Sequence, residues 1–413
     1  MKLLEKIKVY VADFSYSMIG IMLMNATIQL LVYPFLNSRL GAEQFGTTLT
    51  LISICSIMGN SFGIAANYSR VISPNKTQSS DYHFFLLIIS GLALVVSYAA
   101  LRATQSASEI SFILYACLMI ATIIRCYADV EFRIRLAYRQ FCIYYIWIVF
   151  GYIIGVLFFP VFQKWEIILI LAEVLPVIYV VVKFDVLQRN MFRPTKYFRK
   201  NIKSVLLLSG TEMIGALVLH ADRILLELTQ NGMAVTIFYA STVIGKMISL
   251  VTTPLNGVVI GHLSKYEGKL SRKILTVVFG SGILLGIVLN GICVFVSHIF
   301  VRLLYPDVYI EAQKYFVLGS AGQIFYFLAG MLKVILLKFT GEKYQMLTNL
   351  IYLLLFCSIV IPATVIYQLD GMAIALFVVN VARYLIMYGM GMYLVKKDGY
   401  PKGEEKDEYA SNR

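Results

Sequence analysis

The stretch ILTVVFGSGILLGIVLNGICVFV, residues 274–296, decides the fold class. It carries no charged residue and does not alternate between apolar and polar positions, and residues 84–101 and 167–182 have the same character. About 20 apolar residues cross the ~30 Å hydrocarbon core of a bilayer as a helix. A spanning backbone satisfies its hydrogen bonds only as a helix or as a closed barrel, whose strands alternate. The pattern therefore predicts transmembrane helices.

The rest of the chain repeats this pattern. Of 413 residues, 59% are hydrophobic and 14% are charged, whereas soluble proteins carry about 25% charged residues. We therefore expect an all-α integral membrane protein with about 12 transmembrane helices. The predicted spans are residues 13–36, 44–67, 83–101, 111–130, 141–160, 165–183, 204–226, 233–254, 274–299, 314–337, 345–367 and 371–395.

The distribution of Lys and Arg predicts the orientation. With the amino terminus inside, the cytoplasmic segments hold 26 basic residues and the outer segments hold five. This excess favours a multi-pass protein with both termini in the cytoplasm. The net charge of +13 is then explained by loops that face anionic lipids, and we expect no nucleic acid partner.

The longest internal polar stretch, residues 184–203, lies between two sets of six spans. We expect an N-terminal six-helix bundle over residues 1–190, a C-terminal six-helix bundle over residues 191–397, and a polar cytoplasmic tail over residues 398–413. No loop is long enough for a soluble catalytic domain. The six cysteines and four histidines show no metal-ligand spacing, so we expect no catalytic residue, metal or cofactor.

Charged residues inside spans are costly, at about 2.5–3.5 kcal/mol at a helix centre on insertion scales, and they mark functional candidates. Arg383 lies deepest, with an ion pair to Glu173 or Glu212 as its structural alternative. Arg125, Asp129 and Lys333 lie near cytoplasmic ends, where long side chains can reach the interface. The cationic candidates are Arg383, Lys246, Arg223, Arg125 and Lys333.

Span 7 is unusual because it holds Glu212 with Ala216, and no basic residue, four positions later. Such a carboxylate needs another partner, a cation or a proton. The coupling-ion candidates are Glu212, Asp222 and Glu173. The polar cavity candidates, for which hydrogen bonding between helices is the alternative, are Asn25, Gln29, Asn60, Gln323 and Asn380.

Five segments carry a resemblance to a known family. They are LGAEQFG (residues 40–46), YADVEFRIRLAYRQ (127–140), ADRILL (221–226), YPDVYIEAQKYFVLGSAGQIF (305–325) and DGMAIA (370–375). In this order and spacing the chain resembles the Wzx-type polysaccharide flippases of the multidrug/oligosaccharidyl-lipid/polysaccharide (MOP) exporter superfamily.

The resemblance implies two six-helix bundles around a central cavity that opens alternately to each side of the bacterial inner membrane. The implied cargo is an undecaprenyl-pyrophosphate-linked oligosaccharide for O-antigen (lipopolysaccharide), capsule or exopolysaccharide synthesis. The implied partners are a polysaccharide polymerase and a chain-length regulator. Cavities of the family are commonly cationic, and this chain departs from that pattern because Asp129, Glu173, Glu212 and Asp222 also lie in spans.

Two other classes stay open. A drug or metabolite exporter of the same superfamily would respond to hydrophobic cations. A membrane enzyme or a scaffold of polysaccharide assembly is the other class, although an enzyme usually has a large outer loop or a clustered acidic motif. The chain has no GxxxxGK[ST] motif, so an ion gradient or downhill flux is the expected energy source.

Overall fold

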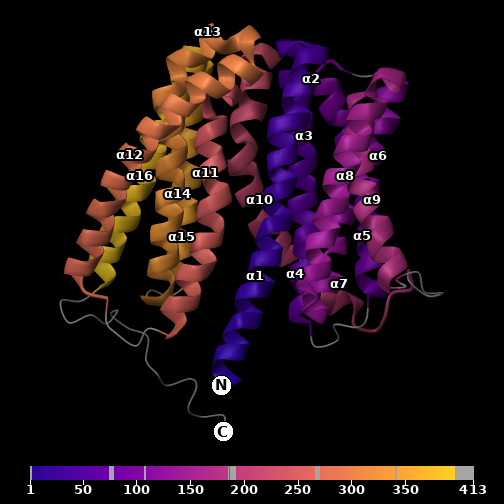
Figure 1. Cartoon of the computed structure of the whole chain (residues 1–413), viewed down its shortest axis with the longest axis horizontal. Helices are drawn as coiled ribbons and strands as arrows, with labels where there is room; N and C mark the ends of the chain where they lie inside the picture. Colours follow the sequence, from indigo (N-terminus) through magenta and orange to yellow (C-terminus); the bar gives the residue numbers. More distant parts are fainter. Residues whose placement is uncertain are drawn as a thin grey trace. The chain divides into compact units, whose positions relative to one another are not determined.

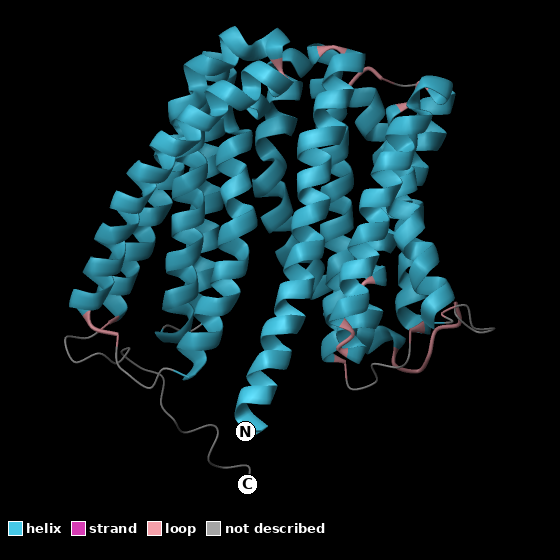
Figure 2. Ribbon diagram, viewed as in Figure 1, coloured by secondary structure: helices cyan, strands magenta, loops and turns pink. Residues whose placement is uncertain are grey.

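A computed structural model describes residues 2–73, 79–106, 108–184, 186, 192–265, 270–339 and 342–395. Nearly all of these residues are helical, and short loops join the helices (Figure 2). The elements are α1 (Lys2–Thr27), η1 (Ile28–Val32), α2 (Tyr33–Leu40), α3 (Ala42–Met58), η2 (Gly59–Ile64), α4 (Ala65–Ile72), α5 (Ser80–Ala103), α6 (Glu109–Ala128), α7 (Val130–Arg135), α8 (Tyr138–Phe162), α9 (Trp165–Phe184), α10 (Phe198–Thr229), α11 (Gly232–Lys265), α12 (Arg272–Leu304), η3 (Pro306–Val308), α13 (Tyr309–Ala312), η4 (Gln313–Tyr315), α14 (Phe316–Phe339), α15 (Glu342–Leu355), η5 (Phe356–Val360) and α16 (Ile361–Leu394).

The predicted spans correspond to these helices. Within the described ranges, ten helical stretches are long and apolar enough to cross a membrane. The last of them, Leu347–Leu394, contains two predicted spans, because the helix is broken at Gln368, where φ is 55°. The predicted eighth span is α11, whose apolar part is Gly232–Ile248. The prediction of an all-helical, multi-pass membrane protein is confirmed.

Three spans contain a turn of π-helix. These turns are η1, η2 and η5, and each continues directly into the next α-helix. A π-turn inserts one extra residue into a helix and often marks a functional position. Two of the predicted polar candidates, Gln29 in η1 and Asn60 in η2, lie in such turns.

Contacts along the chain divide it into two compact units, Met1–Thr236 and Ile237–Arg413. Helix α10 belongs to the first unit because it packs on α3, η2, α4 and α5 (Figure 1). The prediction of two bundles, residues 1–190 and 191–397, was based on six spans in each half, and that division stays a prediction. The predicted tail, residues 398–413, lies outside the described residues.

Glycines allow close helix packing in the first unit. In α8, a Cβ added at Gly151 would lie 2.5 Å from the Cα of Ala172, and one at Gly155 would lie 2.5 Å from the Cα of Ile168. Both contacts are with α9, so this GxxxG pair brings two helix backbones together. Helix α8 also packs on α1, and α6 packs on α9.

Backbone geometry explains both glycines of the segment LGAEQFG. Gly41 ends α2 with φ of 81°, a conformation that favours glycine. Gly46 lies in α3 against the start of α11, where an added Cβ would come within 1.7 Å of the carbonyl oxygen of Gly232. Thr236 reinforces this contact by donating a 2.6 Å hydrogen bond to the carbonyl oxygen of Ala42.

In the second unit, α14 is the central helix. It packs on α12, α15 and α16. Gly319 of α14 lies close to Thr242 of α11, and Gly245 of α11 lies close to Ser320 and Gln323 of α14. Small residues therefore let α11 and α14 approach each other.

We predict that Gly46→Ala lowers the unfolding temperature of the purified protein. The added methyl group overlaps backbone that cannot move aside easily, which costs about 1–3 kcal/mol. The control is Gly91→Ala in α5, where an added Cβ meets no atom within 4 Å. That control should leave stability unchanged or raise it, because alanine favours helix by about 0.5–1 kcal/mol over glycine. Equal unfolding temperatures for the two variants would contradict the close approach at Gly46.

Candidate substrate site

Arg383 of α16 is buried, with 9% of its surface exposed. Its guanidinium carbon lies 4.5 Å from the ring centroid of Tyr326 in α14 and 4.5 Å from that of Tyr352 in α15. Two tyrosine faces therefore stabilise the cation by cation–π attraction. They also fix its orientation without neutralising its charge.

Two of the three guanidinium nitrogens lack an acceptor among the described residues. Nε and Nη1 of Arg383 are buried and have no hydrogen-bond partner among the described residues. A buried donor without an acceptor costs about 1–3 kcal/mol, so the arrangement favours a ligand that supplies acceptor oxygens. Arginine suits phosphate and carboxylate because its nitrogens form a planar fork.

Polar groups surround this arginine. Tyr352 donates a 2.9 Å hydrogen bond to Oδ1 of Asn380, which lies one helical turn before Arg383. Lys333 of α14 contacts Oδ1 of Asn349 in α15 at 3.4 Å. We call Arg383, Lys333, Tyr326, Tyr352, Asn349 and Asn380 the α14–α16 cluster.

The face of α14 that bears this cluster includes an unfilled position. Gln323, Tyr326, Gly330 and Lys333 are spaced three or four residues apart and share one helix face. An added Cβ at Gly330 meets no atom within 4 Å. Unlike Gly151 or Gly155, this glycine serves no close helix contact and leaves space between Tyr326 and Lys333.

Apart from Lys314, the first residue of the span 314–337, the predicted spans of the second unit contain three basic residues and no acidic one. The basic residues are Lys246, Lys333 and Arg383, and Lys246 is half-buried in α11. The four carboxylates predicted inside spans, Asp129, Glu173, Glu212 and Asp222, all fall in the first unit. Over the whole chain, the basic and acidic candidates inside spans nearly balance each other. Divided by unit, all the acidic candidates lie in the first unit, so the spans of the second unit are cationic.

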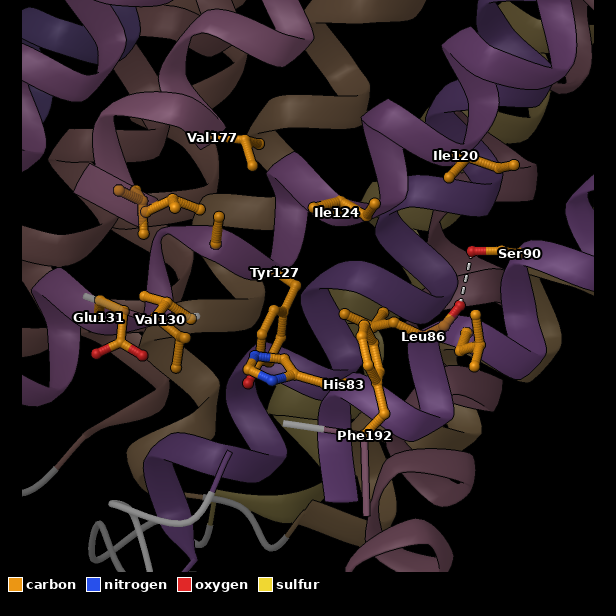
Figure 3. A pocket seen from close by; sticks show the side chains of 15 residues that line it. His83, Leu86, Ser90, Ile120, Ile124, Tyr127, Val130, Glu131, Val177 and Phe192 are labelled. Atoms are coloured by element: carbon orange, nitrogen blue, oxygen red, sulfur yellow. Dashed lines mark hydrogen bonds between the residues drawn. The ribbon is translucent and has the colours of Figure 1, made fainter. Parts of the chain in front are cut away.

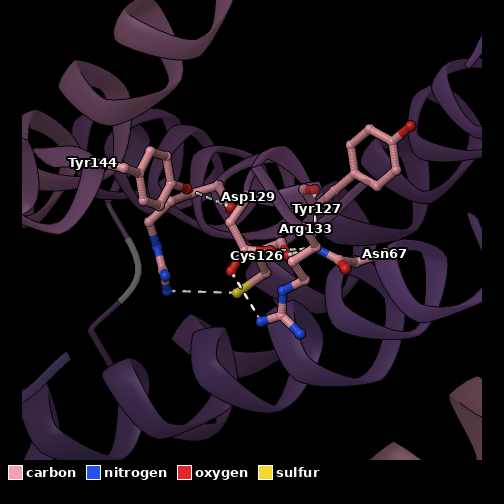
Figure 4. Close-up of polar contacts among 7 residues, drawn as sticks. Asn67, Cys126, Tyr127, Asp129, Arg133 and Tyr144 are labelled. Atoms are coloured by element: carbon pink, nitrogen blue, oxygen red, sulfur yellow. Dashed lines mark hydrogen bonds and ion pairs between the residues drawn. The ribbon is translucent and has the colours of Figure 1, made fainter. Parts of the chain in front are cut away.

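Several charged residues of the first unit are paired with one another. Arg125 of α6 forms an ion pair with Glu173 of α9, and their side chains are 17% and 11% exposed. Asn67 donates a hydrogen bond to Asp129, which also contacts Nη2 of Arg133 at 3.2 Å (Figure 4). Arg125, which we expected to be able to reach the membrane interface, has its charge balanced by Glu173 within the helix bundle. The alternative in which Arg383 forms an ion pair with Glu173 is wrong, because Glu173 pairs with Arg125.

Helix α10 carries the other acidic candidates. Nη1 of Arg223 donates a 3.0 Å hydrogen bond to Ser53 of α3, and Thr47 of α3 donates one of 2.7 Å to Glu227. Asp222 is buried. Glu212 is half-buried and has no ion pair or hydrogen bond among the described residues. Arg223 and Glu227 therefore help to join α10 to α3. The expectation that Glu212 has another partner, a cation or a proton stays a prediction.

The remaining polar candidates are dispersed. Asn25 donates a 2.9 Å hydrogen bond to the carbonyl oxygen of Ile21 within α1. Gln29 and Asn60 are half-buried in their π-turns, and Oε1 of Gln29 has no partner among the described residues. Gln323 is buried beside Gly245. The structure brings Arg383, Lys333 and Asn380 together through residues of α14 and α15. Gln323 lies on α14 beside Gly245, and the roles of all the candidates stay predictions.

Asp81 is not among the candidates predicted from the sequence, because it precedes the predicted third span. It is fully buried in the first turn of α5. Its carboxylate accepts hydrogen bonds from the backbone nitrogen of Thr195 (2.6 Å), the hydroxyl of Thr195 (2.8 Å) and the amide of Asn201 (2.8 Å). Asp81 therefore fixes the segment between α9 and α10 to α5.

Comparisons with known proteins agree with the helical architecture. No family model and no curated protein matches the sequence. Among solved structures, the chain is similar to an inward-facing multidrug resistance MATE family transporter of the MOP superfamily, with a TM-score of 0.67 and 11% identity over 91% of this chain and 97% of that one.

Two further structures show the same likeness. One is the eukaryotic MATE transporter AtDTX14, with a TM-score of 0.56 and 14% identity over 94% of this chain and 96% of that one. The other is a MOP superfamily transporter from Pyrococcus furiosus with a binding pocket of reversed polarity, with a TM-score of 0.56 and 13% identity over 94% and 95% of the two chains. At these identities the likeness shows the fold: this chain has the fold of MOP superfamily transporters over most of its length.

We predict that removing one partner of the Arg125–Glu173 pair destabilises the protein more than removing both. Arg125→Met or Glu173→Leu alone leaves an unpaired buried charge, which costs about 3–5 kcal/mol. The double variant replaces both charges by apolar groups of similar size. Unfolding temperatures of the four proteins check this prediction, and additive effects of the two substitutions would contradict it.

Proposed function

We propose that this protein is a transporter of the MOP superfamily that moves an anionic, lipid-linked oligosaccharide across the bacterial cytoplasmic membrane. The cargo would be an undecaprenyl-pyrophosphate-linked repeat unit for O-antigen, capsule or exopolysaccharide synthesis. A sugar head group cannot cross hydrocarbon unaided, because its hydroxyl groups would lose their hydrogen bonds with water. The fold of MOP superfamily transporters supports the coarser part of this proposal.

The observation that carries the proposal is the α14–α16 cluster. It places Arg383 and Lys333 in a unit whose predicted spans hold no carboxylate. An uncompensated positive charge in a medium of low dielectric attracts anions and repels cations. A pyrophosphate supplies the acceptor oxygens that Nε and Nη1 of Arg383 lack, and such charge-assisted hydrogen bonds are among the stronger ones in proteins.

The same cluster offers features that suit a sugar. Gly330 leaves space beside two half-buried residues of its own helix face, Tyr326 and Lys333. Asn349 in the cluster, and Gln323 on the same face of α14 as Tyr326, provide amide groups that can hydrogen-bond to hydroxyls. The cluster therefore combines a cationic position with open space and neutral polar groups.

The orientation and the partners belong to the same proposal. The excess of basic residues in alternate loops supports cytoplasmic termini. Transport would run from the cytoplasmic to the outer face by alternating access, and a polymerase and a chain-length regulator would then use the cargo. Energy would come from an ion gradient or from consumption of cargo outside. Among the acidic candidates, Glu212 is favoured for ion coupling, because Glu173 is already paired with Arg125.

Export of drugs or metabolites is the second candidate function, and the likeness to a multidrug resistance transporter favours it. The two candidates differ in the charge of their cargo. Hydrophobic cations should bind poorly beside Arg383 and Lys333. The transporter from Pyrococcus furiosus is described as having a binding pocket of reversed polarity that suggests a different function. This description supports our use of the charge of the site to distinguish the two candidate cargoes.

The deciding experiment deletes the gene and measures lipid-linked saccharides in isolated membranes. We expect a complete, unpolymerised repeat unit to accumulate on the cytoplasmic face, together with loss of surface polysaccharide. Normal delivery of the repeat unit to the outer face would refute the proposal. Altered sensitivity to cationic drugs in that case would support the exporter.

We predict that Arg383→Ala, expressed in the deletion strain, reduces translocation by about tenfold or more, because a hydrogen bond to a charged group contributes about 1.5–3 kcal/mol. Arg383→Lys should retain part of the activity, since it keeps the charge and loses the planar fork. Immunoblots of membranes control for protein abundance. Full activity of Arg383→Ala at normal abundance would exclude the cluster as the cargo site.

We predict that Gly330→Leu blocks translocation while the protein still folds, because the added side chain enters the space beside Tyr326 and Lys333. The matched control is Gly389→Leu in α16, a second glycine where an added Cβ meets no atom within 4 Å. Gly389 is exposed and lies outside the cluster, so this control should transport normally. The same assay of surface polysaccharide measures both variants, and equal activity would show that cargo does not use the space at Gly330.

A further inference from the structure

The first unit contains a cavity of about 350 Å³ that is separate from the α14–α16 cluster. It lies between α5, α6, α7 and α9, and it also touches the segment between α9 and α10 (Figure 3). Most of its wall is aliphatic, with Leu86, Ile120, Ile124 and Val177 among the lining residues. An apolar cavity of this kind binds an apolar group.

The cavity is next to the part of the surface that faces lipid. Leu87 lines the cavity and is 54% exposed. Ile88 of the same helix and Val182 of α9 are also exposed. In a membrane-spanning bundle such exposed apolar side chains contact lipid tails, so a tail can enter the cavity from the bilayer.

The polar end of the cavity has its charges satisfied. Glu131 forms ion pairs with Arg70 at 2.7 Å and with Arg135 at 3.2 Å. Arg70 also donates a 2.9 Å hydrogen bond to the hydroxyl of Tyr127, and the ring of His83 lies edge-on to that of Tyr127 at 5.7 Å. The carboxylate of Glu131 is thus already balanced by two arginines, which favours an uncharged occupant of the cavity.

A fixed cationic segment adjoins the cavity. Phe192 lines the cavity, and the residues that follow it include five exposed basic side chains and no acidic one. These residues are Arg193, Lys196, Arg199, Lys200 and Lys203. Asp81 fixes this segment to α5 through Thr195 and Asn201, so its charges are held beside a helix that lines the cavity.

We propose that this cavity binds one acyl chain of an anionic phospholipid, whose phosphate head group binds the cationic segment 193–203. The apolar wall accounts for the chain, and the exposed basic residues account for the head group. Basic residues beside a groove between transmembrane helices are a recognised arrangement for anionic lipid head groups. The lipid would be a resident ligand of the first unit and not the cargo.

Native mass spectrometry of the purified full-length protein tests this proposal. Delipidated protein is titrated with dioleoyl phosphatidylglycerol or with dioleoyl phosphatidylcholine, which have the same chains and different head-group charges. We expect retention of phosphatidylglycerol in preference to phosphatidylcholine. The cavity-filling variant Val177→Phe should lose most of this binding, whereas Ile178→Phe, which changes the exposed next residue of α9, should retain it.

The head group is tested by replacing Arg193, Lys196 and Arg199 together with glutamine. We expect the affinity for phosphatidylglycerol to fall by about tenfold or more, to the level for phosphatidylcholine. The matched control replaces Lys2, Lys6 and Lys8, which removes the same charge from α1 and should change nothing. Equal retention of the two lipids, or unchanged binding by Val177→Phe, would overturn the proposal. Displacement of phosphatidylglycerol by an equal amount of undecaprenyl phosphate would also overturn it and assign the cavity to the cargo.

Discussion

The structure depends on one constraint, which is the cost of placing charge in hydrocarbon. A charged side chain in a spanning helix must find a partner, reach water or bind a ligand. The two units meet this constraint differently. In the first unit, Arg125 pairs with Glu173, and Arg70 pairs with Glu131. In the second unit, Arg383 lies between two tyrosine rings that leave its charge uncompensated.

Buried charged residues therefore have different roles in the two units. The paired charges of the first unit tie α4, α6, α7 and α9 to one another, and replacing them removes contacts between helices. Arg383 ties no helix to another by an ion pair among the described residues. Its stabilisation by aromatic rings is weaker than a buried ion pair with complete hydrogen bonding. A cation held in this way is better explained by a ligand than by stability.

Hydropathy was sufficient to predict the class of fold and nearly every span, because the length and apolar character of a membrane helix are local properties of sequence. Pairing was not predictable. The position of Arg125 near a cytoplasmic end gave no indication of its partner Glu173, which is 48 residues away along the chain. Asp81 gave no signal, because its partners lie far away along the chain, Thr195 in a loop and Asn201 in the first turn of α10.

Part of the α14–α16 cluster could have been found from sequence. Tyr326 and Lys333 are seven residues apart, and the pairs Asn349 with Tyr352 and Asn380 with Arg383 are each three apart. These spacings place polar side chains on single helix faces. Their convergence on one place required the packing of α14, α15 and α16, which depends on contacts between distant residues.

The π-turn η2 has a consequence for the helix that follows it. One extra residue in a helix rotates everything after it by about 100°, because an α-helix has 3.6 residues per turn. Helix α4, which follows η2, presents Asn67 to Asp129 and Arg70 to Glu131. The π-turn absorbs this offset by taking up the extra residue. A regular α-helix through Gly59–Ile64 at full length would rotate Asn67 and Arg70 away from their partners, whereas a chain shortened by one residue there would form a regular helix and keep both contacts.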